Sequence, residues 1–157
     1  MPMRIGDAMP DLSGATTWFN GSLEDIKEHI KGKPTLVHFW AVSCGICKDK
    51  MPQLNEIKAK YGALGLQTIA VHMPRYEVDT DLDTVNEAMT SNHIAEPTAV
   101  DSLHKLKDAF QNEQGWVPVY YLFDAEGKLK TRAAGEFGVS VLQTALDKMF
   151  AMQGAVA

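Results

Sequence analysis

The only two cysteines of the chain stand where an apolar run passes into a helical pattern. The run TLVHFW, residues 35–40, is short and nearly continuously apolar, which predicts a buried central strand. Beyond it, apolar residues keep helical spacing and predict a helix from about Cys44 to Tyr61, kinked at Pro52 because proline lacks the backbone N–H. A buried strand that leads into a long helix is typical of an open α/β sheet, where functional groups gather at the carboxyl ends of strands.

The remaining pattern alternates between strand-like and helix-like segments, which predicts an α/β fold. The 157 residues are the length of one domain, with a core from about residue 7 to residue 150 and a frayed tail over 151–157. Helices are predicted near 22–32, 82–89, 103–110 and 140–150, and strands over 66–72, 98–102, 117–124 and 128–134. The last two strands flank DAEG, residues 124–127, a tight-turn sequence that predicts an antiparallel hairpin.

Composition excludes several classes of function. The net charge is −5 and no run of Lys or Arg forms a basic stripe, so nucleic-acid binding is not supported. No segment has the ~18 consecutive apolar residues of a membrane span. The first residues, MPMRIGDAMPDLSG, lack the apolar stretch of a secretory signal, so we expect a cytoplasmic protein. In such a reducing compartment, two close thiols are chemical or metal-binding rather than structural.

The position of the two cysteines suits disulfide exchange. A helix N-terminus presents unpaired N–H groups and partial positive charge, and both stabilise a thiolate. We therefore expect Cys44 to be the exposed nucleophile, with Gly45 leaving the approach to the sulfurs open, and Cys47 to be the inward resolving thiol. The two sulfurs store the electrons, so no cofactor and no metal are expected.

Two other functions remain open for this dithiol. A zinc site needs four ligands, and the histidines of the chain show no zinc-finger spacing relative to the cysteines, which disfavours a metal-binding or chaperone-like module. A peroxidase of the peroxiredoxin type tends to have Thr or Ser three residues before its attacking cysteine, and this chain has Ala41 there. Stoichiometric metal or steady-state peroxide consumption would revive these alternatives.

The segment FWAVSCGICKDKMPQLNEI resembles the active-site segment of the thioredoxin superfamily. Within that superfamily, IGDAMPDLSG and the long middle section look like the TlpA/ResA branch, and VHFW, VHMPR and VPVYYLFD look closest to YkuV-type thiol–disulfide oxidoreductases. The resemblance implies a thioredoxin-like fold: a central mixed sheet flanked by helices on both faces, with an N-terminal extension and a helical insertion in the middle. It also implies protein disulfides as substrates and a dithiol electron donor, and we expect a monomer.

The same resemblance assigns supporting residues. Trp116 to Val119 resembles the segment that carries the family's cis-proline, so Val117–Pro118 is expected to be cis and to turn the Val117 backbone toward the sulfurs. Gly135 follows the last strand, where the family also has a glycine. Thioredoxin itself has Trp, Pro and Asp at positions that hold Ser43, Ile46 and His38 here.

Several side chains near the motif have both a functional and a structural interpretation. His38 either transfers protons with Cys47 or, as we favour, is a core histidine bonded to a backbone carbonyl. Trp40 shields the dithiol, belongs to the core, or does both. The lysines that flank Cys47, Lys48 and Lys50, are interpreted as a solvated helix face. EVDTDLD, residues 77–83, lacks the glycine and final Glu of a calcium loop and is interpreted as a surface helix cap.

Overall fold

The protein is built on a mixed sheet of six strands. The computed structural model describes the backbone of residues 2–156 and the side chains of residues 2–151. The strands are β1 (Thr17–Phe19), β2 (Thr35–Trp40), β3 (Gln67–His72), β4 (Thr98–Val100), β5 (Val119–Phe123) and β6 (Leu129–Ala134). Their order across the sheet is β1-β4-β3-β2-β5-β6, in which β2, β3 and β4 are parallel and the other pairs antiparallel.

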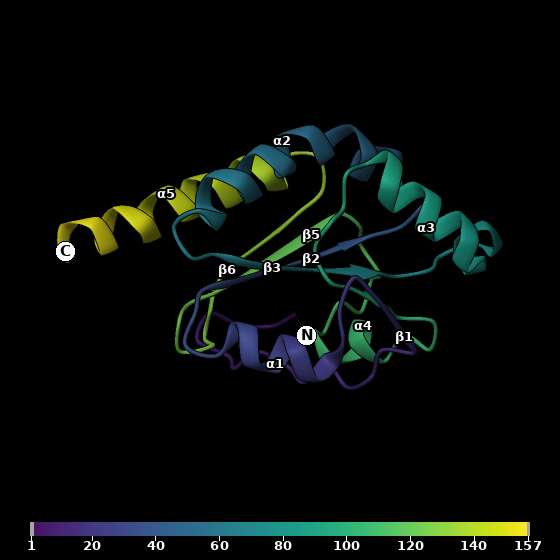
Figure 1. Cartoon of the computed structure of the whole chain (residues 1–157), viewed down its shortest axis with the longest axis horizontal. Coiled ribbons are helices and arrows are strands. Elements are labelled where there is room, and N and C mark those ends of the chain that lie inside the picture. The colour runs from purple at the N-terminus through teal and green to yellow at the C-terminus, as the bar shows by residue number, and fades with distance from the viewer. Residues whose placement is uncertain (1, 157) are drawn as a thin grey trace.

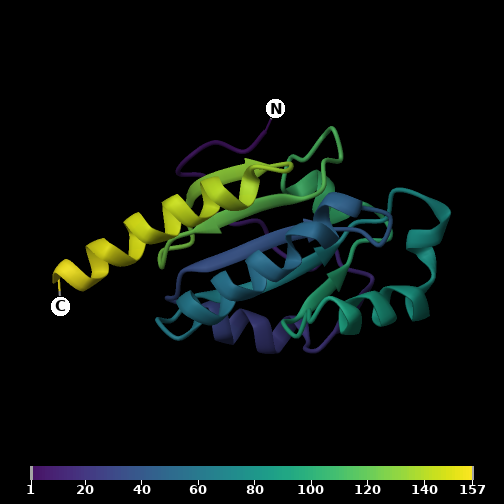
Figure 2. The same cartoon turned by 90° about the horizontal axis from the view of Figure 1, so that it is seen from above.

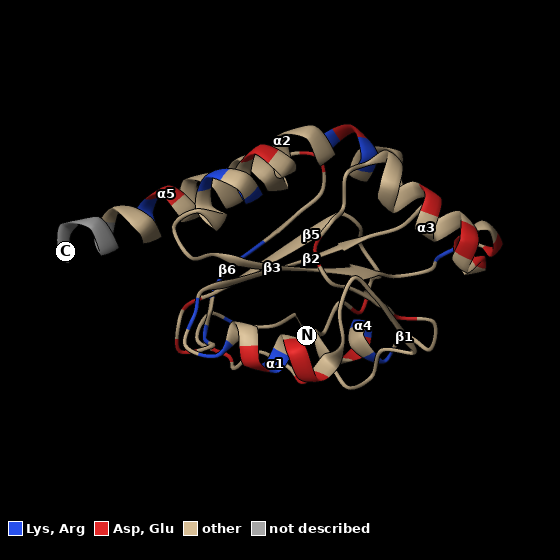
Figure 3. Cartoon of the chain, in the orientation of Figure 1, with Lys and Arg blue, Asp and Glu red and all other residues tan. Residues whose placement is uncertain are grey.

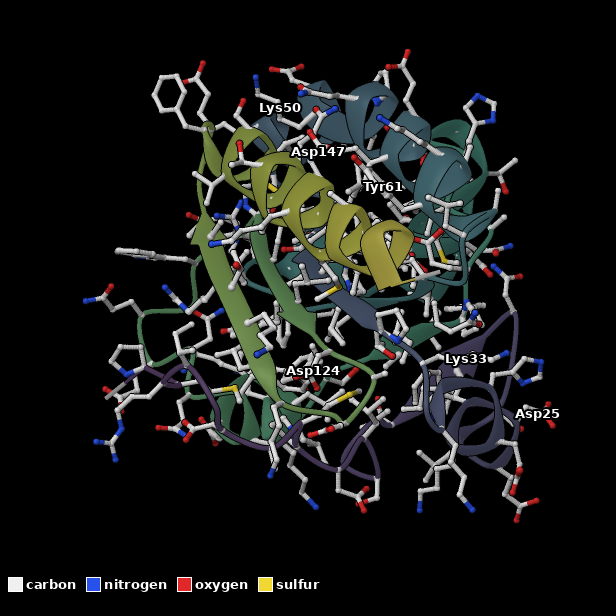
Figure 4. All side chains as sticks on the ribbon, turned by 90° about the vertical axis from the view of Figure 1, so that its left-hand side faces the viewer. Asp25, Lys33, Lys50, Tyr61, Asp124 and Asp147 are labelled. Atoms are coloured by element: carbon white, nitrogen blue, oxygen red, sulfur yellow. A yellow bond between two sulfur atoms is a disulfide. The ribbon has the colours of Figure 1, made fainter. Side chains whose placement is uncertain are left out.

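Helices cover both faces of this sheet. In Figure 1, α2 (Gly45–Gly62), α3 (Leu82–Ser91) and α5 (Gly138–Val156) lie on one side, and α1 (Leu23–Ile30) and α4 (Lys105–Ala109) lie on the other. A short 3-10 helix, η1 (Glu77–Thr80), precedes α3. Seen from above, α2 and α5 run side by side over the sheet (Figure 2), and the Tyr61 hydroxyl donates to the Asp147 carboxylate between them (Figure 4). The predicted thioredoxin-like fold, with helices on both faces, is confirmed.

The central strands form the core because both of their faces are covered. Every residue of β2 and β5 is buried, as the continuous apolar runs predict. The side chains of β2 alternate between two apolar clusters: Leu36 and Trp40 pack under α2 and α5, whereas Val37 and Phe39 face the opposite layer. The hairpin of β5 and β6 is confirmed, and Gly127 supplies the positive φ of its turn.

Some elements differ from the predictions at their ends. The edge strand β1 was not predicted, because three half-buried residues show no strand periodicity. Leu103, expected to begin a helix, is exposed, and α4 starts at Lys105 instead. Helix α5 begins at Gly138 and remains helical to Val156, beyond the predicted end at Phe150. Fraying of residues 151–157 stays a prediction, and Ala157 lies outside the described residues. Within the described part of the chain, no helix is long and apolar enough to span a membrane.

Candidate active site

One edge of the sheet brings together the segments that the sequence singled out. Parallel strands β2 and β3 end there at Trp40 and His72, and antiparallel β5 begins there, with Val119 opposite Phe39. Strand β6 ends at the same edge, since Ala134 pairs with Val119. The dithiol segment, the chain after β3 and the Val117–Pro118 peptide therefore meet where open α/β sheets place their functional groups.

Cys44 and Cys47 are joined by a disulfide in this structure. Their Cα atoms are 5.3 Å apart. Cys44 is the N-cap of α2, and its sulfur accepts a hydrogen bond of 3.0 Å from the Cys47 N–H. The pair therefore has the proximity and the helix N-terminus that the sequence predicts for a redox-active dithiol.

The expected difference in exposure between the two cysteines is wrong. Cys44 is only 3% exposed and Cys47 is 2% exposed, and both belong to the apolar cluster that contains Trp40 and Val42. The Cys44 sulfur is bonded to Cys47 and accepts the N–H of that residue. In the oxidised protein, helix position distinguishes the two cysteines, and residue exposure does not.

The residues between the cysteines lie on the surface. Gly45 and Ile46 are exposed, and a Cβ built on Gly45 would meet no atom within 4 Å. Position 45 therefore faces open space beside the motif, and the role of Gly45 in the approach to the sulfurs stays a prediction. Lys48 is exposed as well, and Lys50 is partly exposed at the outer face of α2 (Figure 4), which agrees with a solvated helix face.

Asp79 is a residue of this site that sequence reasoning missed. It was interpreted as part of a surface cap, yet it is 1% exposed and its carboxylate accepts four hydrogen bonds. Two come from Ser43, from the backbone N–H at 2.8 Å and the hydroxyl at 2.7 Å. The other two come from the N–H groups of Arg75 and Tyr76, at 2.9 and 3.1 Å. Asp79 thus ties the residue before Cys44 to the segment that follows β3.

The hydrogen bonds keep Asp79 ionised despite its burial. Burial on its own raises the pKa of this carboxyl group, but the donors from Arg75, Ser43 and Tyr76 outweigh it and hold the pKa below its usual value. The Arg75 guanidinium also donates to the Ser43 hydroxyl oxygen, at 3.1 and 3.3 Å. In the sequence, the sign of this role was the acidic segment EVDT, residues 77–80. Its composition is typical of a helix cap, so no role at the dithiol was predicted for Asp79. Only the following carboxylate, Asp81, caps α3.

His38 has a carboxylate partner rather than the backbone carbonyl that we favoured. Its Nε2 lies 2.6 Å from Glu96 Oε2, and Lys58 Nζ lies 2.7 Å from the other oxygen of Glu96. Burial raises the pKa of Glu96, but His38 and Lys58 together lower it to about 2. The three side chains link β2, α2 and the segment before β4 in a largely buried hydrogen-bond network. Sequence spacing does not reveal Glu96, because it lies 58 positions from His38.

Trp40 lies fully inside the core, in contact with a second buried histidine. Its ring meets the His72 ring edge to face, with centroids 4.7 Å apart. His72 Nε2 accepts a hydrogen bond of 3.2 Å from the Val42 N–H, in the segment between β2 and the dithiol. Burial lowers the pKa of His72 to about 4, so the ring is neutral near pH 7. In the sequence, His72 was considered only among the histidines that could bind zinc, and no contact with Trp40 or Val42 was predicted.

The Val117–Pro118 peptide is cis, as the resemblance implied. Val117 packs against the apolar cluster that contains both cysteines, and Pro118 O accepts from the Gly135 N–H at 2.9 Å. Tyr120 and Tyr121 are buried core residues, whereas Trp116 is half exposed beside the cis peptide. In the part of the chain that the structure describes, no group of three or more His, Cys, Asp or Glu side chains could hold a metal ion.

Comparisons with known proteins agree with this geometry. The family described as Redoxin matches residues 4–146. The chain is 43% identical over 150 residues to the thiol-disulfide oxidoreductase YkuV of Bacillus subtilis, an alignment that covers 95% of this chain and 98% of that protein. It is 27% identical over 147 residues to the thiol-disulfide oxidoreductase ResA of Bacillus cereus, covering 94% of this chain and 79% of that protein.

Solved structures show the same similarity. The solution structure of a thioredoxin-like protein in the oxidised form has a TM-score of 0.84 and 42% identity, covering 96% of this chain and 99% of the other. A structure described as a putative thiol:disulfide interchange protein DsbE from Chlorobium tepidum has a TM-score of 0.72. At 21% identity, with 94% of this chain and 98% of the other covered, the second similarity supports the fold alone.

Proposed function

The chain belongs to the redoxin family, and we propose that it reduces disulfide bonds of other proteins through Cys44 and Cys47. Its relatives make it an oxidoreductase of the thiol–disulfide class. The observation that carries the proposal is the position of Cys44 at the N-cap of α2, bonded to Cys47 and accepting the N–H of that residue. The structure corresponds to the oxidised enzyme, the product of one reductive cycle.

In the reduced enzyme, Cys44 is the nucleophile of this proposal. In its first turn, α2 directs the Cys47 N–H at the Cys44 sulfur, and a position at a helix N-terminus lowers the pKa of a thiol. The Cys44 thiolate attacks one sulfur of the substrate disulfide, a bond forms between enzyme and substrate, and the other substrate sulfur leaves as a thiolate.

Cys47 completes the exchange as the resolving thiol. Its thiolate attacks the Cys44 sulfur of the mixed disulfide, and the second substrate sulfur leaves, so the substrate gains two electrons and the enzyme becomes the disulfide. A dithiol donor then returns two electrons to the enzyme. The close pairing of Cys44 and Cys47 supports this step, because the attack requires only local rotation of side chains.

The cis peptide supports a docking site for the substrate chain. Among the described residues, the N–H and C=O of Val117 have no hydrogen-bond partner. An extended polypeptide that pairs with Val117 would add a short strand beside the dithiol, with its disulfide over the sulfurs.

The proposal also includes a monomeric enzyme, a cytoplasmic location and an unidentified dithiol donor. The reducing direction of the reaction fits a reducing compartment.

Insulin reduction tests the proposal. With dithiothreitol as donor, the wild type should accelerate insulin precipitation, and Cys44→Ser should reduce the rate to that of dithiothreitol alone. Cys47→Ser should also lose turnover, because its mixed disulfide cannot be resolved internally. Acceleration that persists in Cys44→Ser would contradict the assignment, and faster consumption of hydrogen peroxide than of insulin would favour the peroxidase alternative.

A further inference from the structure

A pocket opens beside the dithiol at the same edge of the sheet. It has a volume of about 650 Å³ and is formed by four segments of the chain. These are the residues after β3, from Met73 to Tyr76; helix α4 with its N-cap; the loop that leads to the cis peptide; and the end of β6. Its volume is large enough for several amino-acid side chains.

The charge of this pocket differs from the charge of the protein. Arg75 and Lys107 line it, and no Asp or Glu belongs to the described residues of its lining. The whole chain carries a net charge of −5, and acidic residues recur on α1 and α3 (Figure 3). The pocket is therefore a local concentration of positive charge in an acidic protein.

Arg75 is held next to the dithiol. Its Nε and Nη2 donate to the Ser43 hydroxyl oxygen, and Ser43 is the chain neighbour of Cys44. A guanidinium group has five N–H donors, so others remain available to a ligand in the pocket. An anion bound by Arg75 would lie close to the sulfur that attacks the substrate.

The nearest carboxylates offset part of this charge, but none of them lines the pocket. Asp79 and Asp101 are buried, and Asp101 uses its two oxygens for the N–H groups of Leu106 and Lys107, both at 2.8 Å. Asp108 lies 3.9 Å from Lys107 Nζ, but it is exposed, and such surface pairs are weak. Glu113, which is exposed, also interacts electrostatically with Lys107. A ligand carboxylate would compete for Lys107 with these exposed groups, whose attraction water weakens.

The walls of the pocket suit a polypeptide. Tyr76 is 64% exposed and Trp116 is 50% exposed, so two aromatic side chains offer apolar contact area on either side. Val117, whose backbone has no partner among the described residues, lines the same pocket. A chain that pairs with Val117 would place its neighbouring side chains against these walls.

We propose that this pocket binds an acidic side chain of the substrate polypeptide, so that Arg75 and Lys107 select disulfides that have Asp or Glu close by. The inference rests on the proposed reductase function and adds a substrate class to it. Charge complementarity carries it: the lining offers cationic donors, and a carboxylate accepts the forked hydrogen bonds of a guanidinium group.

Two disulfide-bonded peptides that differ only by Glu or Gln beside the cystine provide the test. We expect kcat/KM of the wild type to be about tenfold higher for the Glu peptide, the size of one hydrogen bond to a charged group. In Lys107→Gln and Arg75→Gln, the ratio of the two rates should fall to within about threefold of unity. The ratio cancels any general loss of reactivity, which matters for Arg75 because it contacts Ser43.

A matched control separates the pocket from general surface charge. Lys48 is exposed one residue after Cys47 and does not line the pocket, so Lys48→Gln should keep the wild-type ratio. An equal loss of preference in Lys48→Gln would overturn the proposal. Glutathione disulfide, a small carboxylate substrate, should depend less on Arg75 and Lys107 than the Glu peptide does, and an equal dependence would contradict a polypeptide site.

The proposed function and this inference fail in different ways. Reduction of both peptides at equal rates would overturn the acidic preference and leave the reductase intact. Failure to reduce either peptide, in protein that is folded and supplied with dithiothreitol, would overturn both.

Discussion

Asp79 shows how one buried carboxylate can control the geometry of the segment that leads into Cys44. Its two oxygens accept hydrogen bonds from the backbone N–H and the hydroxyl of Ser43 and from the backbone N–H groups of Arg75 and Tyr76. Because Ser43 precedes Cys44, the position of the helix N-terminus depends on this group. Arg75 is held by the same network, through its backbone and through Ser43.

Replacement of Asp79 by Asn tests this role. The amide keeps an acceptor but loses the charge and one acceptor oxygen, so we expect a loss of about 2 kcal/mol in the free energy of unfolding. We expect kcat/KM for insulin to fall about tenfold at a temperature where the variant is fully folded, because the loop before Cys44 loses its anchor. Urea denaturation and the insulin assay measure the two effects.

Asp81 provides the matched control for Asp79. It is exposed and caps α3 through the Asp83 N–H, so Asp81→Asn removes the same charge two residues away. Its unfolding free energy should change by less than about 1 kcal/mol, and its reductase rate should stay at the wild-type value. A wild-type rate in folded Asp79→Asn would show that Asp79 serves stability alone.

His72 predicts a pH dependence of stability. Its pKa in the folded protein, about 4, lies below the ordinary value of 6.5, so the unfolded chain takes up this proton first. Stability should therefore fall as the pH decreases from 6.5 to about 4, by a total on the order of 3 kcal/mol. His72→Gln keeps an acceptor for the Val42 N–H but does not titrate. Denaturation of both proteins across this range should show a smaller slope in the variant than in the wild type, and an equal slope in the variant would contradict the assignment.

Among the helices and strands, the sequence predicts those that have a local apolar pattern or a local turn signal. The strand over 35–40, the helix from Cys44 and the hairpin around DAEG agree with the structure within a few residues, since each has a continuous apolar pattern or a turn signal. Strand β1 was not predicted because its pairing with β4 is a tertiary contact between segments about 80 residues apart. Contacts at that separation leave no periodicity in either segment.

The network of His38, Glu96 and Lys58 links β2, α2 and the segment before β4, so the next prediction concerns how these elements are held together. Glu96→Gln should lower the free energy of unfolding by about 2 kcal/mol at pH 7, because the Lys58 ammonium loses its carboxylate and His38 loses a charged hydrogen-bond partner. The Glu96 pKa of about 2 lies below the ordinary 4.5, so its stabilisation is present above pH 4.5 and is lost as the pH falls through about 2. Wild type and variant should therefore converge across that range.

Glu28, exposed on α1, is the control for Glu96. Glu28→Gln removes the same charge and should change stability by less than about 0.5 kcal/mol at any pH in the series. A difference between Glu96→Gln and wild type that stays constant down to pH 2 would contradict an ionised, paired Glu96.

At the scale of the whole molecule, the order of motifs predicts the fold and the place of the dithiol. The two cysteines, Pro52, the cis peptide at Pro118 and Gly135 occur in the order of the thioredoxin superfamily, and the structure brings the cysteines, Pro118 and Gly135 to one edge. The partners of these residues were not predictable. Asp79, Arg75 and Glu96 lie in segments whose local sequence is typical of a polar surface. The folded chain brings Asp79 and Arg75 to Ser43, next to Cys44, and brings Glu96 to His38 and Lys58.

The central claim is that Cys44 attacks and Cys47 resolves, although both cysteine residues are buried in the oxidised protein. Incubation of each single variant with a disulfide-bonded peptide, followed by mass spectrometry of the intact adduct and of its digest, distinguishes the two roles. The account predicts a stable mixed disulfide at Cys44 in Cys47→Ser and little adduct at Cys47 in Cys44→Ser. An adduct that forms mainly at Cys47, or no adduct in Cys47→Ser, would contradict it.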